Sequence, residues 1–198
     1  MKRAKKILAV LLSMAMVLGM TATAFAGSSG SDKRYGTSDD TGTITVKGVS
    51  ANANGSYEGI TVNAYKIVSA NYDATSGDFK NYTSLYPDAL TVQNTGTNDF
   101  TEDQLSKILK TGMRASGTPY TMTGNNGTYT ANVPVGSYLV VISGADSKVY
   151  NPMVVSVYYT NNNGGNDVSE GIVSINETNA WAKVTTDPKV QKTIVNKD

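Results

Sequence analysis

Residues 127–143 read GTYTANVPVGSYLVVIS, which is two strand-like runs joined by a turn at 134–136. Just before them, Gly124-Asn125-Asn126-Gly127 separates YTMT from GTYTANV, and glycine and asparagine at such a place are typical of a β-hairpin turn. Further short alternating runs with turn residues between them occur at 43–49, 59–70, 151–160, 171–176 and 180–186. Many short strands at this spacing predict an all-β fold, a β-sandwich.

One segment has the period of a helix instead. The sequence DFTEDQLSKILKTGM at 99–113 places three apolar residues on one stripe: Leu105, Ile108 and Leu109. Thr101 and Gln104 have the spacing of a capping box at the start of this helix. We therefore expect one short helix inserted into the sandwich, with its stripe covering an edge or an end of a sheet.

The N-terminus has the pattern of a secretion signal. Basic residues precede the apolar stretch 7–20, and Ala24-Phe25-Ala26 is a cleavage site of the A-x-A type. The stretch that follows is rich in Gly, Ser and Asp, which is typical of a flexible segment. We assign four parts: a signal peptide (1–26), a flexible arm (27–42), the sandwich domain (43–186), and a linker with the first strand of a following domain (187–198).

The composition excludes several classes of function. Four of the 17 basic residues lie in the signal peptide, which leaves 13 basic against 16 acidic residues in the exported chain. We therefore expect no nucleic-acid partner, and no membrane association after signal cleavage. The chain has no Cys and no His, which excludes disulfides, Cys/His triads and ordinary zinc sites. We expect no metal and no cofactor, and the Asn-rich stretch 161–167 is interpreted as a hairpin loop.

The segment GTYTANVPVGSYLVVIS and the later VYNPMVVSVYY resemble the immunoglobulin-like N-terminal domain of Gram-positive fimbrial shaft proteins. The order of signal peptide, arm, strands, helix, G-S-Y-L-V, Y-N-P-M and K…P-K-x-x-K carries this resemblance over residues 42–198. The resemblance implies a structural, non-enzymatic subunit of a sortase-assembled pilus at the cell wall of a Gram-positive bacterium. The implied partners are other pilin subunits, a class C sortase and a host surface ligand.

In such pilins a lysine at the end of the N-terminal domain, in a Tyr-Pro-Lys-Asn-like motif, is joined by the sortase to the C-terminal threonine of the next subunit. Here Trp181-Ala182-Lys183-Val184 stands at that place, so the aromatic residue and the lysine match, whereas the proline and the asparagine do not. Lys183 is the first candidate for the linkage, Lys189 is the second, and an ordinary solvated lysine is the alternative. Because this segment departs from the motif, the sequence leaves open whether the subunit belongs to the shaft, the tip or the base of the pilus.

Lys192, at the start of KTIVNKD, resembles the lysine that forms an intramolecular isopeptide bond in the following domain of such pilins. We expect no such bond inside the sandwich itself, although Lys47 and Lys66 lie in predicted strands. The related collagen-adhesin domains carry the proton-shuttling glutamate in the pattern G-x-Y-x-L-x-E, and Ile142 occupies that place here.

Two other classes of function remain open at this stage. A secreted adhesin or carbohydrate-binding sandwich would be favoured by a concave aromatic surface in the tyrosine-containing polar stretch 71–86. An accessory domain of an enzyme would be favoured by a catalytic domain following residue 198.

The signal assignment predicts cleavage between Ala26 and Gly27. N-terminal sequencing of the secreted protein should begin at Gly27, and secreted material beginning at Met1 would contradict the assignment.

The missing glutamate predicts that no lysine–asparagine bond forms within residues 27–183. Amine attack on an amide releases one ammonia, so a bond would lower the intact mass by about 17 Da. Mass spectrometry of the secreted chain should give the uncrosslinked mass, and a deficit of one ammonia would overturn this prediction.

Overall fold

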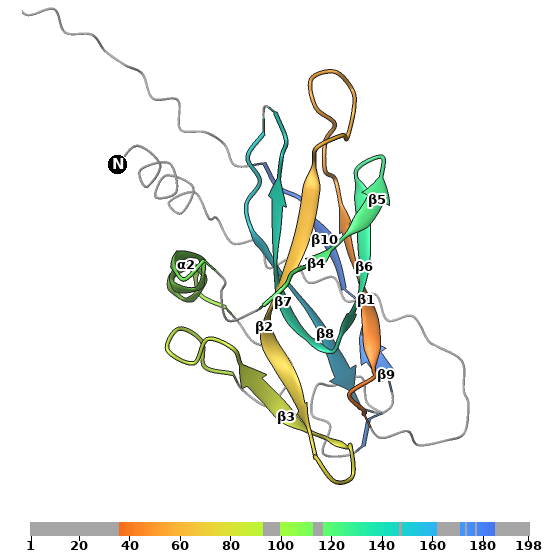
Figure 1. Ribbon diagram of the computed structural model, residues 1–198, viewed down its shortest axis with the longest axis vertical. Coiled ribbons are helices and arrows are strands. Elements are labelled where there is room, and N and C mark those ends of the chain that lie inside the picture. Colours follow the sequence, from red (N-terminus) through yellow and green to blue (C-terminus); the bar gives the residue numbers. More distant parts are fainter. Residues whose placement is uncertain are drawn as a thin grey trace, which may run out of the picture.

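The computed structural model describes residues 36–92, 100–112, 117–146, 148–161, 171–172, 174–176 and 178–184. These residues form two β-sheets and one short helix (Figure 1). The smaller sheet has the order β10 (Thr178–Trp181), β1 (Thr41–Lys47), β6 (Thr128–Pro134), β5 (Thr123–Asn125). The larger sheet has the order β3 (Phe79–Ser84), β2 (Thr61–Tyr72), β7 (Gly136–Ser143), β8 (Met153–Thr160), β9 (Ser174–Asn176), and β4 (Tyr120–Thr121) also pairs with β2. The expected immunoglobulin-like β-sandwich with one short inserted helix is confirmed.

Besides the connections from β1 to β2 and from β6 to β7, two stretches of chain pass from one sheet to the other. In the first, β4 pairs with β2 of the larger sheet and β5 pairs with β6 of the smaller one. Met122 lies between β4 and β5, is buried, and donates its N–H to the carbonyl of Val62 at 2.8 Å. In the second, β9 pairs antiparallel with β8, and β10 then pairs parallel with β1. The second crossing places the end of the described chain beside the end of β1.

The core follows the period-two alternation of the strands. Ile44 and Val46 of β1 point inward and are fully buried, as is Val133 of β6. The hairpin between β5 and β6 turns at Asn126 and Gly127, whose φ angles are 48° and 79°. Positive φ at both central residues is the type I′ geometry that suits the twist of a hairpin, so the predicted turn is confirmed.

The helix forms as the sequence predicts. In α2 (Glu102–Lys110), the Thr101 side chain accepts from the backbone of Gln104, and the Gln104 side chain accepts from the backbone of Thr101. These two bonds make the expected capping box. Leu105 and Ile108 are buried in the same cluster as the core of the sandwich. Tertiary packing of this stripe stabilises a helix that is too short to be stable alone.

The tyrosine-containing polar stretch 71–86 contains a strand of the larger sheet. β3 extends the sheet beside β2, and the register shifts between Asn71 and Tyr72, just before the last pair, Tyr72 with Phe79. Phe79 and Tyr82 pack against the core, and the polar residues between them point outward. Because polar residues dominate the segment, its sequence does not show the pattern of a strand.

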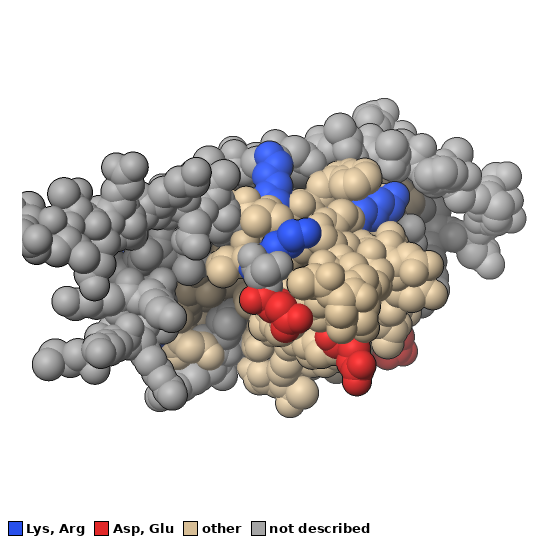
Figure 2. Space-filling view, turned by 90° about the horizontal axis from the view of Figure 1, so that it is seen from above, with Lys and Arg blue, Asp and Glu red and all other residues tan. Residues whose placement is uncertain are grey.

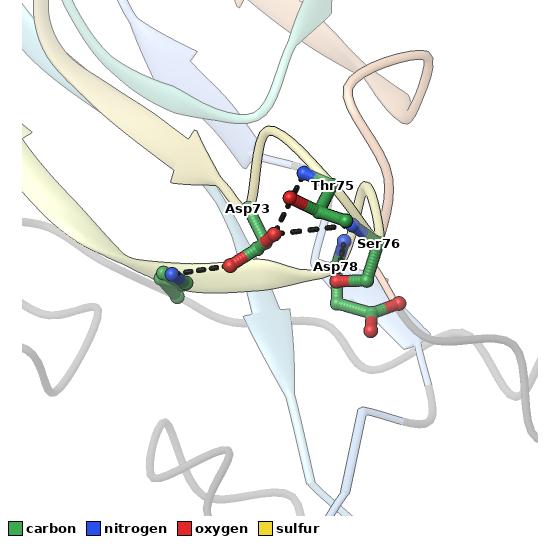
Figure 3. Close-up of polar contacts among 5 residues, drawn as sticks. Asp73, Thr75, Ser76 and Asp78 are labelled. Carbon is green, nitrogen blue, oxygen red and sulfur yellow. Dashed lines mark hydrogen bonds and ion pairs between the residues drawn. The ribbon is translucent and has the colours of Figure 1, made fainter.

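Asp73 organises the turn between β2 and β3 (Figure 3). Its carboxylate accepts the backbone N–H groups of Thr75 (2.7 Å) and Ser76 (3.1 Å) and forms an ion pair with Lys80. The Lys80 contact, followed by the two N–H groups, lowers the pKa of Asp73 below its ordinary value. This turn is therefore fixed by local polar contacts at the surface.

Residues 36–40 of the predicted arm are attached to the sandwich. Tyr159 of β8 donates its hydroxyl to the Asp40 carboxylate at 3.0 Å, and its oxygen also lies 3.2 Å from the carbonyl of Thr37. The hydroxyl of Tyr72 lies 2.8 Å from the same oxygen, and the Tyr82 hydroxyl accepts the backbone N–H of Tyr159. Burial is the main cause that raises the pKa of Tyr159, so its phenol stays protonated and able to donate. The part of the arm before residue 36, like the signal peptide, lies outside the described residues.

No helix in the part of the chain that the structure describes is long and apolar enough to cross a membrane.

The Tyr159 hydroxyl should contribute to stability because its removal leaves buried polar groups without a donor. We expect Tyr159→Phe to lower the free energy of unfolding by about 1–3 kcal/mol in urea denaturation. Tyr86→Phe is the matched control, because the buried Tyr86 hydroxyl has no hydrogen-bond partner among the described residues. That variant should be neutral or slightly stabilising, and equal losses in both variants would show that the network around Tyr159 adds nothing.

Candidate functional site

Lys183 lies just beyond the end of β10, and its backbone is held by β1. In the parallel register Lys47 pairs with Trp181, and the N–H of Ala182 then donates to the carbonyl of Lys47 at 2.8 Å. Ala180 and Ala182 pack against the core. Because neighbouring residues on a strand point to opposite faces, Trp181 and Lys183 face outward.

A second contact fixes the backbone of Lys183 from the other side. Its carbonyl accepts the N–H of Asn151 at 2.9 Å, and the next residue, Val184, forms an isolated β-bridge with Tyr150. Tyr150 is buried, and its hydroxyl accepts the N–H of Ser50 at 2.8 Å. The Lys183 backbone is therefore held between β1 and the segment that leads into β8, while its side chain is exposed.

The amine of Lys183 has the access that a nucleophile needs. Among the described residues, no hydrogen bond or ion pair occupies it. An ordinary lysine amine is protonated near neutral pH and must lose that proton before it attacks an electrophile. No carboxylate in the described part of the chain pairs with Lys183.

Two exposed large apolar residues, Trp181 and Val184, lie close to Lys183 in the chain, and a third, Val149, precedes Tyr150, which bridges to Val184. Trp181 is 67% exposed, Val149 49% and Val184 45%, and these three are the exposed large hydrophobics of the described residues. The Trp181 ring approaches the backbone at Gly48. A Cβ built on Gly48 would lie 3.1 Å from Cε3 of the ring, so the ring lies close to this backbone.

The other candidate lysines are placed as follows. Lys189 and Lys192 lie outside the described residues, so their roles stay predictions. Lys66 of β2 is partly buried, and its amine lies 5.7 Å from the centre of the Tyr138 ring. Burial lowers the pKa of Lys66, and no carboxylate contributes to that shift. Ile142, at the place of the family's glutamate, is buried in the core. These contacts supply no proton shuttle for an internal bond at Lys66.

The sequence did not connect the segment 149–151 with Lys183. It contributed only to the family resemblance through V-Y-N-P, and more than thirty residues separate it from the lysine. A bridge between residues so distant leaves no periodic signal in a single sequence. The contacts of Tyr150 and Asn151 could therefore be found only in the folded chain.

The described residues contain neither a cluster of metal ligands nor, on the face shown in Figure 2, a continuous basic surface. No group of three or more His, Cys, Asp or Glu side chains in the described ranges could hold a metal ion. Most of the predicted hairpin loop at 161–167 lies outside those ranges. On the face seen in Figure 2, the described basic side chains lie apart from one another, and the acidic ones gather toward the opposite edge. This face therefore lacks the continuous basic surface that nucleic-acid binding uses.

The sequence matches no protein-family model and no curated protein. Among solved structures, the T6 backbone pilin of serotype M6 Streptococcus pyogenes, described as a modular three-domain structure, is similar with 23% identity and a TM-score of 0.52. The match covers 74% of this chain and 28% of that pilin.

Two further similar structures have lower TM-scores. The major pilin SpaD of Corynebacterium diphtheriae gives 0.36 at 21% identity, with 74% of this chain and 30% of that chain covered. The major pilin SpaA of the same organism gives 0.34 at 15% identity, with 73% and 30% covered. This chain thus spans less than a third of each pilin, and its β-sandwich has the fold of part of the T6 backbone pilin.

Proposed function

We propose that this chain contains the N-terminal domain of a structural subunit of a covalently assembled cell-surface pilus, in which Lys183 is the linkage lysine. The observation that supports the proposal most directly is the position of Lys183. Its backbone is hydrogen-bonded at Asn151 and lies next to β1, whereas its side chain is exposed. The similarity in fold to part of a backbone pilin agrees with this role.

The reaction at Lys183 would be an acyl transfer. A sortase of class C would present the threonine carbonyl of a second subunit as a thioester. The Lys183 amine attacks that carbonyl carbon, a carbon–nitrogen amide bond forms, the carbon–sulfur bond breaks, and the thiolate leaves. The proton of the lysine ammonium passes to a base of the sortase. In this scheme the sandwich is the substrate and the other protein is the enzyme.

A role as a pilus subunit also implies functions for the other parts of the chain. Residues 1–26 would direct export, residues 43–186 would form the domain, and residues 187–198 would lead into a following domain in which Lys192 forms an internal isopeptide bond. The protein would be located at the cell wall of a Gram-positive bacterium, with other pilin subunits and a host surface ligand as partners. We propose no catalytic role and no cofactor for this domain.

The adhesin alternative receives no support from the aromatic residues of 71–86. Tyr82 and Tyr86 are buried, and the ring of Phe79 packs against the rings of Tyr82 and Tyr159, with centres 4.9 Å apart in both pairs. These rings belong to the core, so they cannot form the concave binding surface that an aromatic glycan site requires.

We expect Lys183→Ala in the full-length protein to abolish the ladder of covalent polymers on denaturing gels of cell-surface extracts. Lys183→Arg should abolish it too, because a guanidinium keeps the charge but does not deprotonate to a nucleophile. Both variants should fold normally, since the Lys183 side chain is exposed.

Lys189→Ala is the matched control and should leave the ladder intact. If the ladder persists in Lys183→Ala and disappears in Lys189→Ala, Lys189 is the linkage residue. If the double variant with both lysines replaced still forms polymers, neither lysine is the linkage residue, and the proposed role of this segment in a shaft subunit is wrong.

A further inference from the structure

Lys183 lies one residue beyond the last contact of its strand with β1. That contact is the bond from the N–H of Ala182 to the carbonyl of Lys47, and no described residue of β1 bonds to Lys183 itself. A strand end that is paired on one side only opens easily, because its last hydrogen bonds are exposed to water. The contacts that hold the Lys183 backbone in one place are therefore those on its other side, with the segment 149–151.

The segment 149–151 is itself held by a buried side chain. Tyr150 is only 4% exposed, and its hydroxyl accepts the N–H of Ser50 at 2.8 Å. Ser50 follows β1 closely, and its neighbour Val49 donates its N–H to the carbonyl of Gly127 at 3.1 Å. The Tyr150 hydroxyl thus ties the segment to a stretch of backbone that β1 and the turn at Gly127 already fix.

These contacts form a closed ring around Lys183. The chain leaves β1 at Lys47, and soon afterwards Ser50 is bonded to the Tyr150 hydroxyl. The bridge from Tyr150 to Val184 then leads back to Lys183, whose preceding residue is bonded to Lys47 again. One link of this ring is a side-chain bond, at the Tyr150 hydroxyl, and the others are backbone bonds. Removal of that oxygen opens the ring without changing the lysine.

We propose that Tyr150 is a positioning residue for the acyl transfer at Lys183. Its hydroxyl fixes the segment 149–151, and this segment fixes the backbone from which the amine projects. The inference rests on the proposed function and adds to it a buried residue that acts on the lysine through the backbone.

A fixed backbone matters for this reaction because two proteins have to meet at one nitrogen atom. The lysine stem is flexible already, and a mobile backbone lowers further the fraction of time that Nζ spends within bonding distance of the thioester carbon. A misplacement of about 1 Å can slow an enzymatic reaction about a hundredfold. We therefore expect a partial loss of order at Lys183 to slow linkage by about tenfold.

The test compares two tyrosine variants of the mature full-length protein in a transfer reaction with a purified class C sortase and a threonine-containing donor peptide. Tyr150→Phe removes the bond to Ser50 and should lower kcat/KM for linkage to Lys183 by about tenfold. Tyr138→Phe is the matched control, because Tyr138 is also buried and its hydroxyl donates to the carbonyl of Pro134, opposite the start of β1. This control should react at the original rate even if its melting temperature falls as far.

A second variant removes the same bond from its other side. Ser50→Pro deletes the N–H that the Tyr150 hydroxyl accepts, and it should slow linkage to a similar extent. Because both changes break one bond, the double variant should be no slower than the slower of the two single variants. Effects that multiply in the double variant would show two independent losses and would contradict the inference.

Amide hydrogen exchange measures the positioning without any reaction. The N–H of Asn151 donates to the Lys183 carbonyl, so its exchange rate reports whether the segment 149–151 still holds the lysine. In Tyr150→Phe this amide should exchange at least about tenfold faster, whereas in Tyr138→Phe its rate should change no more than the rates of the core amides. Unchanged protection of Asn151 in Tyr150→Phe would overturn the inference.

The two proposals fail in different ways. If Lys183→Arg abolishes linkage but Tyr150→Phe reacts as fast as Tyr138→Phe, the positioning role is wrong and the linkage role stands. If Lys183→Arg is still linked at the original rate, the proposed function fails, and the positioning role fails with it.

Discussion

The parallel pairing of β10 with β1 is the constraint on which the site depends. β1 lies inside the smaller sheet, with β6 on its other side, so its position is fixed by the core. Because β10 runs parallel to it in a defined register, the chain must leave the sandwich where β1 ends. Lys183 follows at once, its backbone enclosed by the contact of Ala182 with Lys47 and by the contact with Asn151. A parallel strand requires a crossover connection, and β9 with its pairing to β8 provides the last part of it.

The opposite end of β1 is held by hydrogen bonds between side chains. There, residues 36–40 are attached through the Asp40 carboxylate and the hydroxyls of Tyr159 and Tyr72, which are hydrogen-bonded within the sandwich. A buried network of this kind is stabilising only when all of its members are satisfied. At the Lys183 end, backbone hydrogen bonds hold the chain and the side chains remain exposed. The first end is thus held by side-chain hydrogen bonds, and the second by backbone hydrogen bonds.

Trp181 is exposed although it is a large aromatic residue. A tryptophan that is two-thirds exposed is unusual for a folded domain, in which aromatic rings dominate the core. The other aromatic residues of this domain follow that rule, as the cluster of Phe79, Tyr82 and Tyr159 shows. The exposed Trp181 therefore contrasts with the tyrosines that are buried in the core.

The sequence by itself determined the elements whose signals are local. The strands repeat every two residues, the Asn126-Gly127 turn needs positive φ, and the capping box joins residues three apart, so each could be recognised within a short window. The candidate Lys183 was found in the same way, from its place after the last predicted strand and from the family resemblance.

Tertiary structure alone decided the strand β3 in a polar segment, the attachment of residues 36–40, and the bridge between Tyr150 and Val184. The last two features join residues that are distant in the chain, whereas β3 is stabilised by the packing of Phe79 and Tyr82 against the core. Such contacts impose no period on the sequence around either partner, so only the folded chain shows them.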